Sequence, residues 1–255
     1  MTDDNDTGPA KPAAKVLGRE AKVVRKRFYK IVTVAAEGTA FVIHLDGRPV
    51  RTPKKAVLTV PACALAEAIA AEWHNQAVNI EPSAMPLTRL ACTALDAVAL
   101  EPDAVAAEIG RYAASDLLCY RAGMPAALAE RQAAGWDPVL AWGEHELREK
   151  IQRGTGLMPI AQSPDVAKAM VDAVRPLDPL RLAAMSVLTT LLGSAVLALA
   201  LLRRHLTLER VWLLAHIDED WQIECWGTDA DAATRRANRL RTATAAATVL
   251  AMLAE

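Results

Sequence analysis

The sequence predicts an α+β protein in which a small N-terminal β-rich domain with one packed helix precedes a larger C-terminal all-helical domain. Two observations lead to this prediction. Short runs rich in β-branched and aromatic residues, separated by turn residues, fill residues 28–60. Beyond Pro82 apolar residues recur with helical spacing, and prolines mark several helix starts. We therefore expect domains at residues 24–82 and 83–255, preceded by a disordered tail at residues 1–23.

The tail prediction follows from composition, because its Pro, Gly, Asp and Lys residues bury too little apolar surface to order the segment. Asp3, Asp4 and Asp6 precede its lysines, and no long apolar stretch follows them. This pattern is typical of neither a secretory signal nor an acid-poor mitochondrial targeting segment. The cysteines show no CxxC spacing, so we expect reduced thiols and a cytoplasmic protein.

The charge distribution gives no indication of nucleic-acid binding. The 29 lysines and arginines nearly balance the 30 aspartates and glutamates, and the net charge is −1. No global field therefore attracts a polyanion. The last predicted helix has a basic side, but no aromatic residues alternate with its arginines, and we expect no nucleic-acid partner. This side consists of Arg235, Arg236, Arg239 and Arg241.

The β-rich domain is expected to contain several short strands and one helix. The strands are predicted in the runs FYKIVTV, AFVIHL, RPVR and AVLTV. Asp46 and Gly47 suit a two-residue type I′ hairpin, in which both residues take a positive φ. Pro49 lacks an amide hydrogen and places its strand at an edge. A helix then begins near Pro61 and packs across the sheet through Leu65, Ile69 and Trp73.

The helical domain is divided by prolines that follow a capping residue. Asp137, Ser163 and Asp178 each stand before a proline, which fixes φ in the first turn while the preceding side chain caps the helix. The expected helices lie at residues 84–98, 102–118, 125–133, 137–152, 164–174, 179–203, 207–225 and 229–253.

The stretch from Leu182 to Leu202 carries no charge and is long enough to span a bilayer. It could form a single transmembrane helix or the central helix of the helical domain. Arginines flank both ends and no Trp or Tyr lies at either end, so we predict a buried helix and no membrane span. A stripe of small residues along it ends at Gly193. This stripe predicts close helix packing. Gly193→Leu should therefore destabilise the fold by about 1–3 kcal/mol through overpacking.

Motifs for catalysis are missing, and we expect neither a cofactor nor a metal. His145 and Glu146 open a segment that resembles a zinc-protease helix, but Glu149 stands where the second histidine is required. The glycines at Gly154 and Gly156 lack both the third glycine and the preceding strand of a phosphate-binding loop. Tight binding or hydrolysis of ATP is therefore not expected.

An enzyme of unrecognised type, with a cleft between the two domains, is the alternative function. Arg111, Tyr112 and Asp116 would carry its chemistry. Arg111, Ser115 and Asp116, however, lie at four- and one-residue spacing near the end of a predicted helix, which is typical of local pairing and capping.

An acidic run interrupts the apolar pattern of the helix predicted at residues 207–225. Asp218, Glu219 and Asp220 follow one another, so at least one carboxylate must lie near the apolar face. The run is either ordinary helix surface with one internal ion pair or an acidic patch that faces a partner. For the second hypothesis the candidate partner-binding residues are Asp218, Glu219, Asp220, Trp221, Gln222, Trp226 and Asp231.

Several motifs occur in one order and together resemble a known family, the assembly chaperones for the α subunit of the F1 part of ATP synthase. The resemblance covers nearly everything from Arg27 to Arg241. The motifs are RFYK, LDGRPVRTP, IAAEW, MPLTRLACTALD, SDLLCYR, WDPVLAW and DEDWQIECWG.

The resemblance implies a small β-rich domain joined to a larger helical one, with neither catalysis nor a cofactor. It also implies that the partner is the unassembled F1 α subunit, which is held until a β subunit takes its place. Such a holder needs a few aromatic or arginine anchors inside a polar rim. The candidate aromatic anchors are Trp73, Trp136, Trp142, Trp212, Trp221 and Trp226.

The chain departs from the mitochondrial members of this family after Gly227. Those members resemble WG-x-x-E-W-A-H-D, whereas this chain continues TDADAATRR and keeps only acidity, at Asp229 and Asp231. Together with the absence of an arginine-rich targeting segment, this leads us to expect a bacterial, cytoplasmic member of the family.

Overall fold

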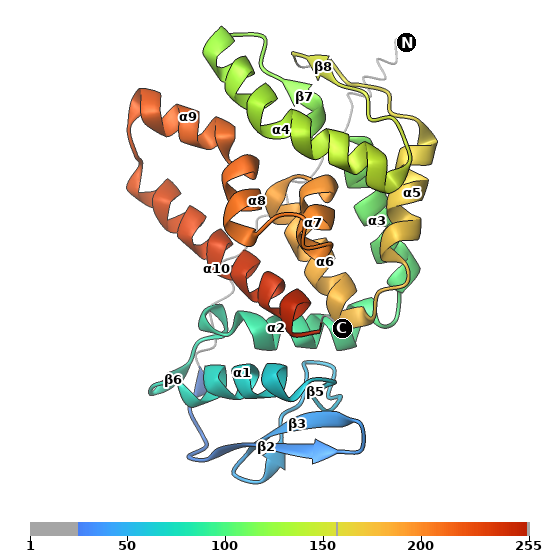
Figure 1. The fold of residues 1–255 in the computed structure, drawn as a ribbon. Helices are drawn as coiled ribbons and strands as arrows, with labels where there is room; N and C mark the ends of the chain where they lie inside the picture. Colours follow the sequence, from blue (N-terminus) through green and yellow to red (C-terminus); the bar gives the residue numbers. More distant parts are fainter. Residues whose placement is uncertain (1–24, 157, 254–255) are drawn as a thin grey trace, which may run out of the picture.

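The computed structural model describes residues 25–156 and 158–253, so the tail predicted at residues 1–23 lies outside the described residues. The predicted α+β class is confirmed: small sheets and one helix come first, and a largely helical region follows (Figure 1). The domain boundary near residue 82 stays a prediction.

The main N-terminal sheet is built around a central strand. Strand β3 (Ala40–Leu45) pairs antiparallel with β2 (Val32–Glu37) on one side and with β4 (Arg48–Pro49) and β5 (Thr59–Val60) on the other. The turn between β3 and β4 has the predicted hairpin geometry, because φ is 49° at Asp46 and 75° at Gly47. Strand β4 ends the sheet order, as predicted for a strand with a proline.

Helix α1 (Cys63–His74) packs on this sheet. Its Leu65 and Ile69 are fully buried and meet Ile43 and Leu58 in one apolar core. A second, two-stranded sheet, which was not predicted, joins β1 (Arg25–Lys26) to β6 (Asn79–Ile80). The chain before the sheet is thereby fastened to the segment that follows α1.

The largely helical region begins after β6, and several of its helices start at a proline as predicted. Pro164 and Pro179 stand at first positions, and the side chains of Ser163 and Asp178 cap the helices that follow. The helices and helical turns are η1 (Pro82–Ala84), α2 (Pro86–Thr93), η2 (Ala94–Val98), α3 (Pro102–Ala114), η3 (Leu117–Cys119), α4 (Ala126–Leu147), α5 (Pro164–Val174), α6 (Pro179–Leu192), α7 (Ala195–Leu202), α8 (Leu208–Ala215), α9 (Ile217–Trp226) and α10 (Ala230–Met252).

One helix runs where two were predicted. The helices expected at residues 125–133 and 137–152 are both part of α4, which contains Pro138 in its interior. A proline removes one helical hydrogen bond. Nearby, Trp136 is fully buried, and its indole N–H donates to the carbonyl oxygen of Leu214 at 2.8 Å. This hydrogen bond anchors α4 to α8 two residues before the proline. Beside α4 lies a parallel pair of two-residue strands that was also not predicted, β7 (Tyr120–Arg121) with β8 (Gly154–Thr155).

The long apolar stretch is two helices, and the prediction of one central helix at residues 179–203 is wrong. Helix α6 ends at Gly193, where φ is 64°, and the side chain of Ser194 starts α7 by accepting from Leu197 N at 3.0 Å. The buried carboxylate of Asp116 also accepts from Val196 N at 3.1 Å. Left-handed backbone and polar capping together end one helix and begin the next. Among the described residues, no helix combines the length and the apolar character that crossing a membrane requires.

A second break was also missed, because the helix predicted at residues 207–225 is divided into α8 and α9 at His216. The ring Nδ1 of His216 lies 2.8 Å from the carbonyl oxygen of Trp212. The backbone N–H of His216 turns to Leu213 O instead, at 3.3 Å. The histidine side chain thus competes with the helical hydrogen bond at this point.

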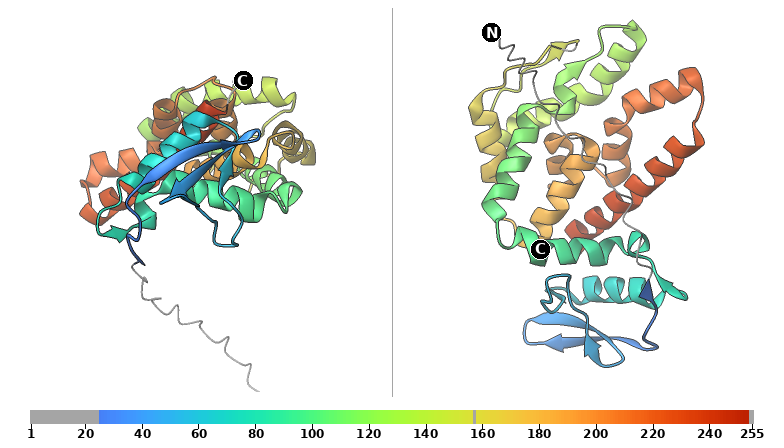
Figure 2. Two further views of the ribbon diagram at one scale, coloured as in Figure 1. Left: turned by 90° about the horizontal axis from the view of Figure 1, so that it is seen from below. Right: turned by 180° about the vertical axis from the view of Figure 1, so that it is seen from behind.

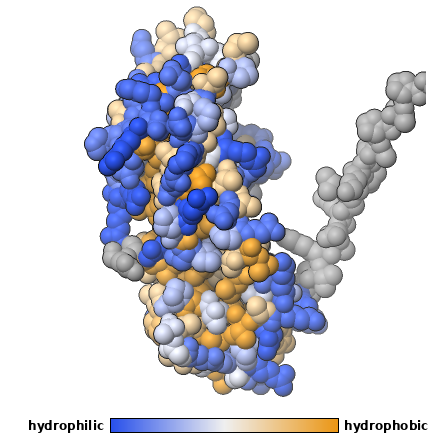
Figure 3. Space-filling view, turned by 90° about the vertical axis from the view of Figure 1, so that its right-hand side faces the viewer, coloured by the Kyte–Doolittle hydropathy of each residue, from blue (hydrophilic) through white to orange (hydrophobic). Residues whose placement is uncertain are grey.

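The helices surround α6, which buries eight of its 14 residues, and α7, which buries six of its eight (Figures 1 and 2). Helix α2 lies between this bundle and α1, with the sheet on the far side of α1 (Figure 1). On the face drawn in Figure 3, hydrophilic residues cover most of the helical part, whereas apolar residues gather on the lower part, which holds the N-terminal strands and α1.

Candidate partner-binding site

Helix α9 and the first half of α10 form an arm that diverges from the bundle (Figure 1). We define this arm as residues 217–240. Ile217 is the buried residue of α9, and the buried residues of α10 begin only at Ala243. The arm is therefore largely solvent-exposed on both helices, unlike the bundle that carries it.

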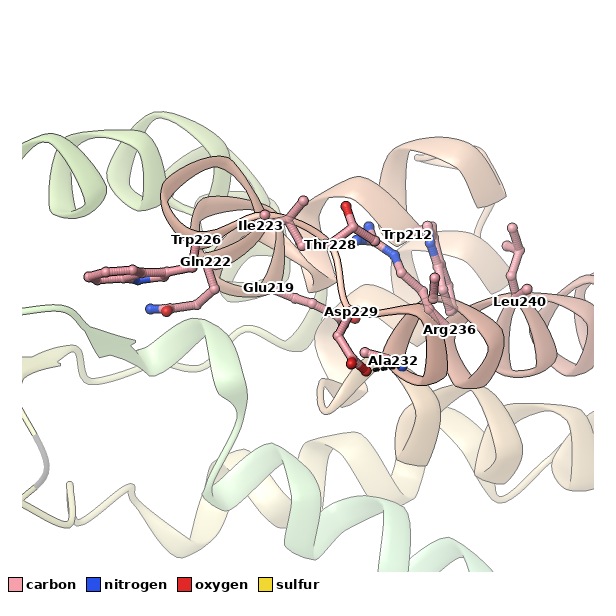
Figure 4. Close-up of a pocket in the computed structure, with 13 residues that line it drawn as sticks. Trp212, Glu219, Gln222, Ile223, Trp226, Thr228, Asp229, Ala232, Arg236 and Leu240 are labelled. Carbon is pink, nitrogen blue, oxygen red and sulfur yellow. Dashed lines mark hydrogen bonds between the residues drawn. The ribbon is translucent and has the colours of Figure 1, made fainter.

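An apolar groove lies between the two helices of the arm. Its cavity has a volume of about 570 Å³, and we call it the arm groove. Trp226 stands at its end with 83% of its surface exposed (Figure 4). The groove is lined by Trp212, Glu219, Gln222, Ile223, Trp226, Gly227, Thr228, Asp229, Ala232, Ala233, Arg236, Ala237 and Leu240.

The acidic run that begins at Asp218 makes side-chain contacts with neighbouring elements. Gln132 Nε2 of α4 donates to Asp218 at 2.7 Å. From α10, Arg239 Nη2 donates to Glu219 at 2.7 Å, and Arg236 Nη1 lies 2.5 Å from Asp220. The structure thus shows two ion pairs and one further hydrogen bond. An ordinary helix surface with one internal ion pair was one of the two hypotheses for this run. These contacts fasten α9 to α4 and α10.

A buried histidine lies at the base of the arm. His216 packs against the ring of Trp212 with centroids 3.9 Å apart, and its Nε2 is 3.8 Å from a carboxylate oxygen of Glu219. Burial lowers the pKa of His216, and the nearby Arg236 and Arg239 act in the same direction. The imidazole therefore favours its neutral form, which keeps this junction free of an additional positive charge.

The structure brings only some of the predicted site residues together. Glu219, Gln222 and Trp226 line the arm groove. The other predicted residues lie outside its lining, namely Asp218, Asp220, Trp221 and Asp231. Trp221 is half-buried and packs against the core. Asp231 is exposed in the first turn of α10, where Asp229 caps the helix by accepting from Ala232 N at 2.7 Å.

The sequence hypothesis missed the opposite wall of the groove. This wall belongs to α10 and consists of Ala232, Ala233, Arg236, Ala237 and Leu240. Their spacing of three and four residues places them on one helical face, and this spacing was the signal available in the sequence. It was overlooked because alanines give a weak apolar pattern, and the arginines between them were interpreted as a separate basic side.

The residues proposed for an enzyme do not share a cleft. Asp116 is fully buried, and its carboxylate accepts backbone N–H groups of Leu118 and Val196 at 3.0 and 3.1 Å. Burial raises its pKa to about 6, against the effect of these hydrogen bonds. The side chain of Arg111 is 76% exposed and pairs with Glu108 on its own helix. Asp116 therefore organises the chain between α3 and α7, and the alternative hypothesis loses its site.

Known proteins resemble this chain along most of its length. The family described as ATP12 chaperone protein matches residues 26–144. The mitochondrial protein atp12 of Schizosaccharomyces pombe is 23% identical over 219 residues, which are 81% of this chain and 75% of that protein.

Solved bacterial structures are more similar. The Atu1473 protein of Agrobacterium tumefaciens has 46% identity and a TM-score of 0.86, covering 91% of this chain and 87% of that one. Atp12 of Paracoccus denitrificans has 40% identity and a TM-score of 0.83, covering 90% of this chain and 99% of that one. A variant of the Paracoccus protein with one aspartate changed to lysine also matches, with a TM-score of 0.82. The chain therefore belongs to the ATP12 chaperone family, whose members are assembly factors and not enzymes.

Proposed function

We propose that this protein binds the unassembled α subunit of F1 ATP synthase, keeps it competent for assembly with the β subunit, and holds it through the arm. One observation carries the proposal: the arm groove is apolar, open, and ends at the exposed Trp226. A subunit taken from an obligate assembly exposes an apolar interface that promotes aggregation. A holder has to cover this interface and release it again.

The composition of the arm groove supports a reversible contact. Apolar side chains form its floor, and charged groups of Glu219, Asp229 and Arg236 surround them. Protein interfaces typically have this arrangement, in which a dry centre contains an aromatic anchor and a polar rim excludes water. The space between two diverging helices suits an apolar segment or helix of the client.

The acidic run has an indirect role in this proposal. Because Glu219 and Asp220 are paired with arginines of α10, they set the distance between the two walls of the groove. Asp231 is exposed in the first turn of α10, and no ion pair of Asp231 is found among the described residues. In the proposal Asp231 contacts a basic group of the client at the rim, where charge mainly affects the rate of association.

Co-expression with the F1 α subunit tests the proposal. Trp226→Ala should leave the melting temperature unchanged, since the side chain makes few contacts within the fold. It should reduce the amount of soluble α subunit and weaken binding about tenfold or more, as expected for an aromatic anchor. Met124→Ala is the matched control, because Met124 is also apolar and 82% exposed but lies outside the arm. Full protection by both Trp226→Ala and Gln222→Ala would reject the arm as the binding surface.

A charge reversal tests the rim. Asp231→Lys should slow association severalfold at low salt, with a smaller effect at high salt, because a single rim charge acts through a screened field. Glu67→Lys on α1 is the control, since Glu67 is likewise exposed and lies in the N-terminal part of the fold. Equal effects of the two reversals would mean that only net charge matters.

A further inference from the structure

A second large groove lies in the N-terminal part of the molecule, between the strands and α2. Its cavity has a volume of about 1170 Å³, and we call it the basic groove. The walls come from the chain near β1, the turn between β3 and β4, the loop before β5, and α2. It shares no lining residue with the arm groove.

The floor of the basic groove is apolar. Tyr29, Val50 and Met85 are buried beneath it, and Ile80 is partly buried beside them. Phe28 stands at the rim with 67% of its surface exposed. An occupant with apolar side chains would therefore find both a floor and an exposed aromatic contact.

The rim of the same groove is positively charged although the whole chain has a net charge of −1. Its cations are exposed, and within the described residues none of them lies in an ion pair with a carboxylate. These cations are Arg25, Arg48, Arg51, Lys55 and Arg89.

The acidic residue of this lining, Asp46, carries one negative charge against the five cations, so the lining keeps a net charge of +4. Its carboxylate accepts the backbone N–H groups of Lys30 and Ile31 at 3.1 and 2.8 Å. These hydrogen bonds lower the pKa of Asp46, which therefore stays ionised and fixed to the backbone. The local field in the groove is positive.

The groove geometry favours a protein segment over a small anion or a nucleic acid. A volume of about 1170 Å³ exceeds a typical small-molecule site, and the cations are spread along the rim instead of converging on one point. Binding of unpaired bases uses open aromatic faces. The lining has one exposed ring, that of Phe28, which cannot stack a series of bases. Tyr29 offers no open face, because it is buried, its hydroxyl donates to Trp73 O at 2.7 Å, and the guanidinium of Arg27 lies over its ring.

We propose that the basic groove is a second docking surface of this chaperone and binds an extended client segment in which acidic residues alternate with apolar ones. This inference rests on the proposed function, since the segment is taken to belong to the unassembled α subunit. The apolar side chains lie on the floor, and the carboxylates pair with the rim. Two separate contacts on one client raise the overall affinity without requiring either contact to be tight, so each one remains reversible.

The first test uses a fluorescent ten-residue peptide of alternating glutamate and leucine, with a lysine-leucine peptide for comparison. The full-length protein should bind the acidic peptide, and binding should weaken with salt. Arg48→Glu combined with Arg89→Glu should weaken it at least tenfold, because no side-chain hydrogen bond of either residue occurs among the described residues and the fold loses nothing. The matched control is Arg210→Glu with Lys150→Glu, which changes the net charge equally on exposed sites outside the groove and should change affinity by less than twofold. Equal binding of the two peptides would overturn the proposal.

The other possible occupants give distinct results in the same assay. If Asp3→Asn, Asp4→Asn and Asp6→Asn in the full chain together tighten peptide binding tenfold, the acidic N-terminal segment of this chain is the occupant and the proposal is wrong. If a 20-nucleotide single-stranded DNA displaces the peptide at equal concentration, the groove is a nucleic-acid site and the proposal is also wrong.

Binding of the α subunit then separates this inference from the proposed function. Failure of the unaltered protein to hold the α subunit would reject the proposed function, and peptide binding would still report on the chemistry of the groove. If the unaltered protein holds the α subunit, the Arg48→Glu and Arg89→Glu variant should hold it about tenfold more weakly. Equal affinity of the two for the α subunit would overturn the second docking surface while leaving the arm in place.

Discussion

The helices α6 and α7 and the arm are held by different kinds of contact. In α6, Leu182, Met185 and Leu188 are fully buried, whereas α9 buries only Ile217. Polar contacts in the bundle are buried as well, as at Asp116, while those of the arm are ion pairs with partly exposed partners. The difference indicates that the bundle supplies the free energy of unfolding and that the arm can be changed, or occupied by a client, at small expense to the fold.

The largest effect is expected at the polar centre of the bundle. Asp116→Asn keeps the shape of the side chain but turns an N–H₂ group toward the backbone N–H groups that the carboxylate accepts. One or two buried donors then lose their acceptor, and we expect a loss of about 3 kcal/mol in the free energy of unfolding. Urea unfolding measures it. A loss below about 0.5 kcal/mol, which is usual for surface positions, would contradict the role of Asp116 as the joint between α3 and α7.

The bundle and the arm should respond to acid in opposite directions. Burial raises the pKa of Asp116 to about 6, so its protonated form stabilises the fold at low pH, and this contribution is lost as the pH rises through about 6. Burial lowers the pKa of His216, so its contribution is present above pH 6.5, the ordinary histidine value, and is lost as the pH falls through the lowered pKa.

Unfolding free energies between pH 7 and pH 4.5 test this contrast. The difference between the unaltered protein and Asp116→Asn should grow on acidification by about 2 kcal/mol. The difference between the unaltered protein and His216→Gln should shrink over the same interval. Two differences that move together would show that the regions do not titrate independently.

A smaller effect is expected from reversing the central carboxylate of the arm. Glu219→Lys removes the pair with Arg239 and places a cation near Arg236 and His216. We expect a loss of about 1 kcal/mol, because the pair is partly exposed to solvent. Binding of the α subunit should fall about tenfold, since the groove changes shape. Glu219→Gln, which keeps a hydrogen-bond acceptor without the charge, is the matched control. Its stability and its affinity for the α subunit should lie between those of the unaltered protein and those of Glu219→Lys.

Two measurements on each variant distinguish a binding defect from a folding defect: the melting temperature, and the amount of α subunit that stays soluble on co-expression. A well-folded Glu219→Lys variant that fails to protect supports the arm. If Asp218→Lys, Glu219→Lys and Asp220→Lys each fold and protect fully, the binding surface lies elsewhere.

The smallest expected effect concerns Gly193, where the sequence predicted overpacking. Gly193 ends α6 at a φ of 64°, and an added Cβ would lie 3.7 Å from the nearest atom of Leu117, which is an ordinary contact. Backbone strain should therefore lower the free energy of unfolding by about 1 kcal/mol for Gly193→Ala. We expect a similar value for Gly193→Leu. Thermal unfolding compares the two. A leucine variant that is much less stable than the alanine variant would restore the overpacking argument.

Local signals in the sequence predicted much of the fold. Asp46 and Gly47 specify their hairpin by their own backbone preferences, and Ser163 and Asp178 cap the helices expected after them. The errors arose where tertiary contacts decide. Pro138 lies within α4, where Trp136 is anchored to α8, and the break at Gly193 interrupts a run whose apolar pattern continues unchanged.

The candidate site was predicted less completely than the fold. The sequence located the acidic run and Trp226, which lie on one helix. It could not show that arginines about 16 to 20 residues away would pair with these carboxylates, because such pairing depends on how α10 folds back beside α9. The basic groove escaped prediction for the same reason, since it is lined by elements that are separate in the sequence.

Hydrogen exchange of the full-length protein, with and without the F1 α subunit, tests most directly whether the arm is where the client binds. The account predicts slow exchange in α6 and α7 in both samples and fast exchange in residues 217–240 of the free protein. On addition of the α subunit, residues 217–240 should become protected while α6 and α7 stay as they were. Protection that appears elsewhere and leaves residues 217–240 unchanged would contradict the account.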